Sequence, residues 1–277
     1  MKKIFYDYSV IKFKLPSRER LVKRLGDYDA LAEFAVLSFR NLEADARDSE
    51  NAYIYIQQKA AEYKVSIKGL VEWENCHEAL YKSFMINTYA MFSEFIENLK
   101  EDIKILIDSD FSFVGDKDIS DYERLKRSLC IIGIKPDIPI WLEQLEKYYR
   151  IVRNHVAHCG LDDEKCLRLF NDIDIKSMRE EYKVFANRAP NPPGKMTIDD
   201  FYLYSATVKH IANLILISLE TRINWSGIGR THPELIKRHP NGTDRRKLAQ
   251  QVLQGYGKFD CTKEELDQIT ADIRNNW

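Results

Sequence analysis

The six residues 153–158 (Arg-Asn-His-Val-Ala-His) contain the side chains of this chain that are best suited to chemistry. Arg153 and His158 stand at the end of a long amphipathic segment, directly before Cys159 and Gly160. A guanidinium is permanently charged and binds phosphate oxygens through two parallel hydrogen bonds. An imidazole titrates near neutral pH and can accept or release a proton during a reaction. Together these two groups can bind and cleave a phosphodiester.

RNA suits this chemistry best, because its ribose 2′-hydroxyl can act as an internal nucleophile. The reaction needs a base for that hydroxyl, an acid for the leaving oxygen and a cation for the charge on the phosphorane. We expect His158 to do the acid–base work and Arg153 to bind phosphate. Asn154, one turn before His158, is expected to orient the imidazole or to donate to phosphate. We expect neither a metal nor a cofactor.

On a helix with about 100° per residue, these side chains turn away from the apolar stripe that contains Val152. Arg150, Arg153, Asn154 and His158 then form a second, cationic face. Arg153 and His158 lie about 7.5 Å apart along the helix axis. One phosphate therefore reaches both only through a fold-back of the chain or a second subunit. A purely structural interpretation is also open, because the helix macrodipole favours histidine in a last turn.

The composition predicts an all-α protein. Its 277 residues include only 11 Gly and 8 Pro, which is typical of long helices with few tight turns. Hydrophobic residues make up 44% of the chain and charged residues 31%, which is ordinary for a globular protein. The formal net charge of −1 gives no whole-molecule attraction to nucleic acid or to a membrane, so any RNA site must be local.

Apolar residues recur at spacings of three and four after Ser17, which predicts a succession of helices. Capping boxes at Thr197 and Thr262 mark the starts of the last long helix and of a final short one. Residues 1–16 are aromatic and β-prone and are expected to form a strand or an extended arm. The expected longer helices cover residues 17–25, 28–47, 51–64, 77–107, 121–131, 140–159 and 197–223. We divide the chain into an N-terminal helical extension (1–75), a helical bundle (76–223) and a basic C-terminal appendage (224–277).

The five cysteines lack Cys-x-x-Cys spacing, which favours reduced thiols in a cytoplasmic protein. The apolar stretch at the N-terminus is interrupted by Asp7, and the longest apolar run, 211–219, is too short to span a bilayer. We therefore expect no membrane partner. A zinc site is conceivable but not expected, because its candidate ligands have no standard spacing: His155, His158, Cys159 and Cys166.

The stretch IWLEQLEKYYRIVRNHVAHCG, residues 140–160, resembles the signature helix of the HEPN superfamily of helical ribonucleases and nucleotide-binding domains. The family motif is Arg, usually followed by Asn, and then His after about four to six intervening residues. Arg153, Asn154 and His158 match this motif. The preceding helix, with Phe92-Ser93-Glu94-Phe95-Ile96, is similar to the family's acidic helix, and the resemblance covers roughly residues 75–223.

The resemblance implies a bundle of four or five helices that forms a homodimer along the motif helix. Two Arg/His pairs would then make one composite, metal-independent ribonuclease site, with the Glu94 carboxylate supporting Arg153. Family members of this kind often act as toxins or anti-phage (abortive-infection) effectors, so an antitoxin or regulatory protein is a further expected partner. Val156 stands where toxins silenced by tyrosine nucleotidylation carry Tyr, so we do not expect that form of control.

Residues 222–247 carry seven Lys or Arg against two acidic residues, with Trp225 nearby. Cations interleaved with an aromatic ring can hold an RNA backbone and stack a base. A solvated basic surface is the equally simple alternative. The side chains that we consider for RNA binding are Arg150, His155, Trp225, Arg230, Arg245 and Arg246.

Two other functions remain open at the level of sequence. The chain could be a non-catalytic helical module that dimerises or binds a partner protein through the motif face. It could also be a nucleotide-sensing domain of the HEPN type, in which Arg153 binds a ligand phosphate.

Overall fold

The computed structural model describes residues 11–67, 74–116, 118–158, 163–185, 188–232, 235 and 242–276. The fold is all-α, as the sequence predicts, and no strand occurs within these ranges. The helices are α1 (Pro16–Arg47), α2 (Ala52–Glu62), α3 (Glu74–Leu106), α4 (Asp121–Ile131), α5 (Ile140–His158), α6 (Asp163–Asn171), α7 (Ile175–Glu181), α8 (Ile198–Leu219), α10 (Gly242–Gly255) and α11 (Lys263–Asn276). Short 3-10 turns are η2 (Lys183–Phe185), η3 (Glu220–Arg222) and η4 (Trp225–Arg230).

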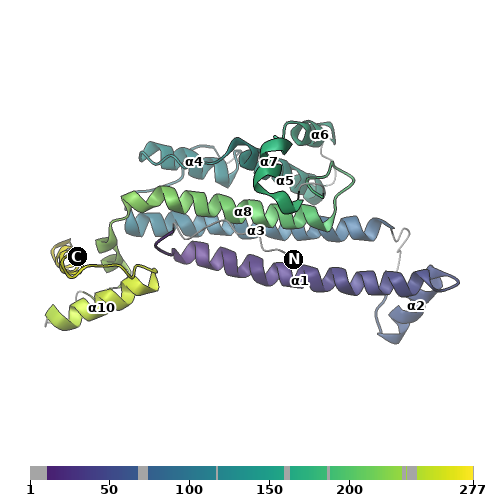
Figure 1. The fold of residues 1–277 in the computed structure, drawn as a ribbon, viewed down its shortest axis with the longest axis horizontal. Coiled ribbons are helices and arrows are strands. Elements are labelled where there is room, and N and C mark those ends of the chain that lie inside the picture. Colours follow the sequence, from purple (N-terminus) through teal and green to yellow (C-terminus); the bar gives the residue numbers. More distant parts are fainter. Residues whose placement is uncertain are drawn as a thin grey trace.

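The helices form three layers (Figure 1). α3 and α8 make the middle layer, α1 covers one side of it, and α4 to α7 lie on the other side. α2 folds back at the far end of α1, while α10 and the C-terminus lie at the opposite end of the molecule (Figure 1). α5 therefore packs against α3 and α8 and is separated from α1 by them.

The sequence predicts two segments, 17–25 and 28–47, where the structure has the single helix α1. Gly26 lies between them, and a Cβ at this position would meet nothing within 4 Å. Glycine weakens a helix by about 1 kcal/mol but does not end it. The inner face of α1, with Leu25 and Ala32 fully buried, packs along α3 and α8, and this packing carries the helix through the glycine.

The cap predicted at Thr197 is confirmed, because its backbone N–H donates to the Asp200 carboxylate at 2.9 Å. The cap predicted at Thr262 is confirmed in the same way, with N–H to Glu265 at 2.9 Å. α8 is buried on most of its circumference, since Phe201, Leu203 and Tyr204 point in different directions around the helix and are all fully inaccessible. None of the helices in the described ranges combines the length and apolar character that a membrane span needs.

Residues 11–15 form part of the arm predicted for 1–16, and residues 1–10 lie outside the described ranges. The Lys14 N–H donates to the Tyr256 carbonyl at 2.6 Å, and Phe13 and Leu15 are buried in the main core. That core also contains Phe95 of the predicted bundle and Leu253 of the predicted appendage. The three predicted regions therefore follow one another along the chain but share one hydrophobic core.

η4 fits closely against the C-terminal end of α3. The Asn224 N–H donates to the Leu106 carbonyl at 2.6 Å, and the Arg230 guanidinium donates to the Lys104 carbonyl. Both bonds satisfy carbonyls that have no partner inside the helix. A Cβ on Gly227 would lie 1.9 Å from the Ile105 carbonyl oxygen, so only glycine permits this approach.

We expect Gly227→Ala to lower the free energy of unfolding by at least about 2 kcal/mol, because η4 must move away from α3. Gly26→Ala is the matched control and should raise it by about 0.5–1 kcal/mol, because its Cβ enters open space on a helix. Urea unfolding followed by circular dichroism measures both. Equal effects of the two substitutions would contradict the close fit of η4.

Candidate functional site

α5 carries the candidate motif and buries its apolar stripe as the sequence predicts. Leu142, Leu145, Tyr149 and Val152 are at most 3% exposed and face α3 and α8. The helix begins directly after Pro139, which cannot donate a backbone hydrogen bond and is tolerated at a helix start. The motif thus lies in the last two turns of a rigidly packed helix.

Arg153 and Asn154 lie together in the structure. Arg153 Nη1 donates to Asn154 Oδ1 at 2.8 Å. The guanidinium carbon of Arg153 lies 4.1 Å from the ring centre of Tyr89 on α3, which is a cation–π contact. Arg153 is half-buried, and its Nε is buried without a hydrogen-bond partner. The guanidinium is therefore oriented by one amide and one aromatic ring.

His158 forms the last residue of α5, and its side chain lies outside the described part of the structure. The same holds for the Val156 side chain, and for Cys159 and Gly160 as a whole. The relation between the Arg153 guanidinium and the His158 imidazole therefore stays a prediction.

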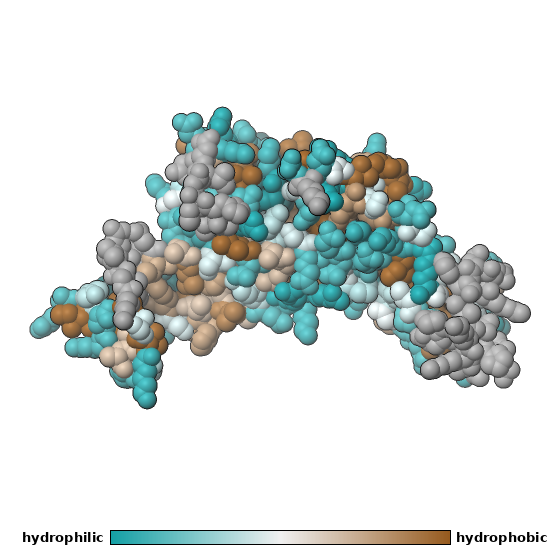
Figure 2. Space-filling model, turned by 180° about the vertical axis from the view of Figure 1, so that it is seen from behind, coloured by the Kyte–Doolittle hydropathy of each residue, from teal (hydrophilic) through white to brown (hydrophobic). Residues whose placement is uncertain are grey.

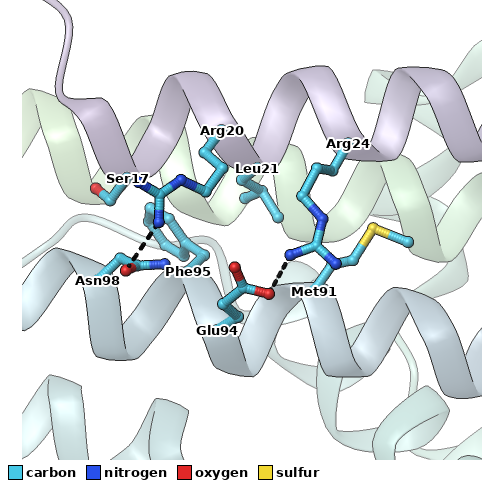
Figure 3. A pocket seen from close by; sticks show the side chains of 8 residues that line it. All are labelled: Ser17, Arg20, Leu21, Arg24, Met91, Glu94, Phe95 and Asn98. Carbon is cyan, nitrogen blue, oxygen red and sulfur yellow. Dashed lines mark hydrogen bonds and ion pairs between the residues drawn. The ribbon is translucent and has the colours of Figure 1, made fainter.

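Glu94 does not support Arg153, which corrects an expectation drawn from the family resemblance. Its carboxylate is paired with the guanidinium of Arg24 on α1, and the neighbouring Arg20 donates to Asn98 at 3.2 Å (Figure 3). Tyr89, which does contact Arg153, is five residues before Glu94 and thus about 140° away around α3. Because α3 lies between α1 and α5, only one of these two side chains can face α5.

The carboxylate close to the motif is instead Glu146, on α5 itself. Arg150 Nε donates to Glu146 Oε1 at 3.1 Å, and the two side chains are 15% and 2% exposed. Burial raises the pKa of Glu146 from 4.5 to about 7, and the positive charge of Arg150 opposes that rise. Near neutral pH this buried carboxyl group is therefore divided between its charged and its protonated form.

Tyr204 on α8 completes a cluster of polar groups between α3, α5 and α8. Its ring is fully buried and its hydroxyl has no hydrogen-bond partner. Burial raises the Tyr204 pKa well above its usual value, Glu146 and Tyr89 add to the rise, and Arg150 and Arg153 oppose it. We call these five residues the buried polar cluster. The face that the sequence presents as open and cationic is thus half-covered by α3 and α8.

His155 lies on another side of α5, because two residues rotate the helix by about 200°. It lines a cavity of about 210 Å³ between α3, α5, α6 and the segment before α8. Lys82 and Glu78 of α3 also line this cavity and form an ion pair at 2.8 Å. The remaining lining residues are Val152, Cys166, Pro193, Gly194 and Met196. His155 and Arg153 therefore do not belong to one site within a single chain.

Three described arginines of the basic C-terminal region have contacts within the fold. Arg222 donates to the Ile132 carbonyl at 2.7 Å, and Arg230 to the Lys104 carbonyl. Arg246 is paired with Asp267 of α11. Trp225 is partly buried, with ring centres of Phe13 and Tyr256 each 6.1 Å from its own. These contacts hold Trp225, Arg230 and Arg246 within the fold, and RNA binding by these residues stays a prediction. The Arg245 side chain lies outside the described residues.

Three members of the buried polar cluster were not predicted from the sequence, namely Glu146, Tyr89 and Tyr204. Glu146, Arg150 and Arg153 are spaced by four and three residues, which places them along one helix face, and this signal could have identified Glu146. Tyr89 has no comparable signal, because its contact with Arg153 depends on how α3 and α5 pack.

Comparison with known proteins gave no significant match to a family model, to a curated protein or to a solved structure. Within the described residues, no group of three or more His, Cys, Asp or Glu side chains is arranged to hold a metal ion. The functional argument therefore rests on the geometry around α5.

The raised pKa of Glu146 predicts a pH-dependent stability. The folded state binds the proton of the Glu146 carboxyl group more tightly than the unfolded state does. The contribution of this group to the free energy of unfolding is therefore complete below about pH 4.5 and is lost as pH rises to about 7. We expect deprotonation of Glu146 to lower the free energy of unfolding by about 3 kcal/mol across this pH range. Glu146→Gln should abolish that part of the pH dependence in urea unfolding from pH 4.5 to 8. Glu101→Gln, at a carboxylate whose side chain is 60% exposed, is the control and should keep the wild-type slope.

Proposed function

We propose that this protein is a metal-independent endoribonuclease of the HEPN type, acting as a toxin or anti-phage effector. The observation that carries the proposal is the end of α5, where Asn154 and the Tyr89 ring orient the Arg153 guanidinium five residues before His158. Orientation before substrate binding is what makes a cation effective in stabilising a transition state. The family resemblance supplies the reaction.

In the proposed reaction the ribose 2′-oxygen attacks the adjacent phosphorus and the bond to the 5′-oxygen breaks. One imidazole takes the proton of the 2′-hydroxyl, and an acid gives a proton to the leaving 5′-oxygen. Arg153 binds the non-bridging oxygens, on which negative charge increases in the phosphorane. The products are a 2′,3′-cyclic phosphate and a 5′-hydroxyl.

A homodimer would supply the second set of groups that this reaction needs. Arg153 and His158 lie about 7.5 Å apart along α5 and about 140° apart around it. A single helix end therefore presents them to different directions. Two copies of α5 placed end to end would bring Arg153 of one chain near His158 of the other.

A second candidate function is favoured by the burial of the motif face. Arg150 is held by Glu146, and Arg153 is half-buried against Tyr89, so both cations have structural contacts. These contacts suit a non-catalytic module that dimerises or binds a partner protein. Nucleotide sensing has less support, because the cavity of about 210 Å³ beside His155 is smaller than typical ligand pockets of roughly 300–1,000 Å³.

RNA cleavage by the purified full chain in EDTA tests the proposal. We expect wild type to leave cyclic-phosphate ends, and Arg153→Ala and His158→Ala each to lower the rate by about 100-fold or more. Arg153→Lys should recover only part of the activity, because an ammonium lacks the planar fork. Arg179→Ala, at an exposed cation on α7, is the control. No cleavage of transfer, ribosomal or messenger RNA by wild type would favour the non-catalytic module.

Tyr89 is proposed as a positioning residue that acts through Arg153. Tyr89→Leu removes the cation–π contact and should lower kcat by about tenfold with a smaller change in KM. Tyr89→Phe retains the ring and should keep wild-type kinetics. If both substitutions lower kcat equally, the ring does not position Arg153.

A further inference from the structure

The outward face of α1 exposes large apolar side chains that no other part of the described chain covers. Leu31, Phe34 and Leu37 are 56%, 69% and 58% exposed. Figure 2 shows apolar surface gathered over the middle of this helix. A contiguous exposed apolar patch on a folded protein commonly marks an interaction surface.

These residues belong to a stripe that runs the length of α1. At about 100° per residue, its members lie within about 60° of Phe34 around the helix. The stripe extends about 42 Å from Arg20 to Asp48. Its exposed members are Arg20, Lys23, Asp27, Ala30, Leu31, Phe34, Leu37, Ser38, Asn41, Asp45 and Asp48. We call this set the α1 stripe.

The two ends of the α1 stripe carry opposite charges. Its first turns carry Arg20 and Lys23, and its last turns carry Asp45 and Asp48, all four of them exposed. Two of these groups have side-chain contacts within the chain. The Tyr55 hydroxyl donates to Asp45 at 3.3 Å, and Arg20 donates to Asn98 at 3.2 Å and acts electrostatically on Asp102. The apolar residues occupy the middle, centred on Phe34.

We propose that the α1 stripe binds the α1 stripe of a second copy of this chain in antiparallel orientation. A two-fold axis at Phe34 would place Leu31 opposite Leu37 of the other copy. The same axis would place Lys23 opposite Asp45, and Arg20 opposite Asp48. Apolar residues would then meet apolar residues, and cations would meet carboxylates. The stripe is therefore self-complementary, as a two-fold interface requires.

The charge pattern selects a second copy over a lipid surface. A helix that lies on a membrane carries Lys and Arg along its polar borders and binds anionic lipid. Here Asp45 and Asp48 would be repelled at one end, whereas the antiparallel pairing satisfies them. Spacings of three and four along the seam are those of packed helix pairs.

This inference does not rest on the proposed ribonuclease. α1 lies on the opposite side of α3 and α8 from α5, so pairing through the α1 stripe leaves the end of α5 uncovered (Figure 1). A dimer through α1 and a dimer through α5 are different assemblies, and substitutions in α1 separate them.

Sedimentation equilibrium of the full chain at about 1–50 µM tests the pairing. Wild type should self-associate, and Phe34→Glu should weaken association by about 100-fold, because two carboxylates would meet at the axis. Glu33→Lys is the control, since Glu33 is exposed on α1 but about 100° from Phe34, and it should associate like wild type. Unchanged circular dichroism shows that each variant is folded.

Charge exchange tests the orientation independently of Phe34. Lys23→Glu and Asp45→Lys should each weaken association by about tenfold, and the double variant should regain it, because only antiparallel pairing joins these two positions. A monomeric wild type would overturn the proposal. So would an association that Phe34→Glu leaves intact, or a double variant no stronger than the single ones. Leu31→Glu replaces Phe34→Glu if the latter does not fold.

Discussion

The buried carboxylate of Asp200 fixes the arrangement on which the rest of the structure depends. It is fully inaccessible and accepts hydrogen bonds from the Tyr149 hydroxyl at 3.0 Å and from the Thr197 N–H at 2.9 Å. Asn191 adds its backbone N–H at 2.8 Å and its side-chain amide at 2.7 Å. Burial nevertheless raises the pKa of Asp200, so this network must be complete for the charge to be tolerated. It joins α5, the segment before α8 and the start of α8 in one geometry.

The rotation of α5 about its own axis follows from this network. Tyr149 must reach Asp200, and this contact sets how α5 is turned. Glu146 lies three residues before Tyr149 and Arg153 lies four after it. Both are therefore directed to the edges where α5 meets α3 and α8. Glu146 is thereby buried and takes Arg150 as its partner. Arg153 reaches the Tyr89 ring instead of open solvent. A structural hydrogen-bond network thus orients the cation of the candidate site.

The sequence was sufficient for the helices whose signals are local. The apolar spacing of α5 and the capping residues at Thr197 and Thr262 identify elements and starts, because neighbouring residues determine both. The sequence was insufficient where the packing of helices against one another determines the continuity of a helix or the direction of a side chain. Gly26 suggests a break that the α1–α3 contact removes, and Glu94 matches an acidic-helix pattern although its direction around α3 points to Arg24. The side chain around which α5 is oriented, Asp200, is visible in the sequence only as a helix cap.

The middle layer of α3 and α8 has a consequence for both faces of the molecule. It buries the inner side of α1 and the inner side of α5 at once, and it lies between the two outer helices. The exposed apolar residues of α1 add nothing to this core, and their exposure is unfavourable in an isolated chain. The cations of α5 are in turn constrained by α3 and α8 and do not need α1. An assembly through α1 can therefore form or dissociate while the end of α5 keeps its geometry.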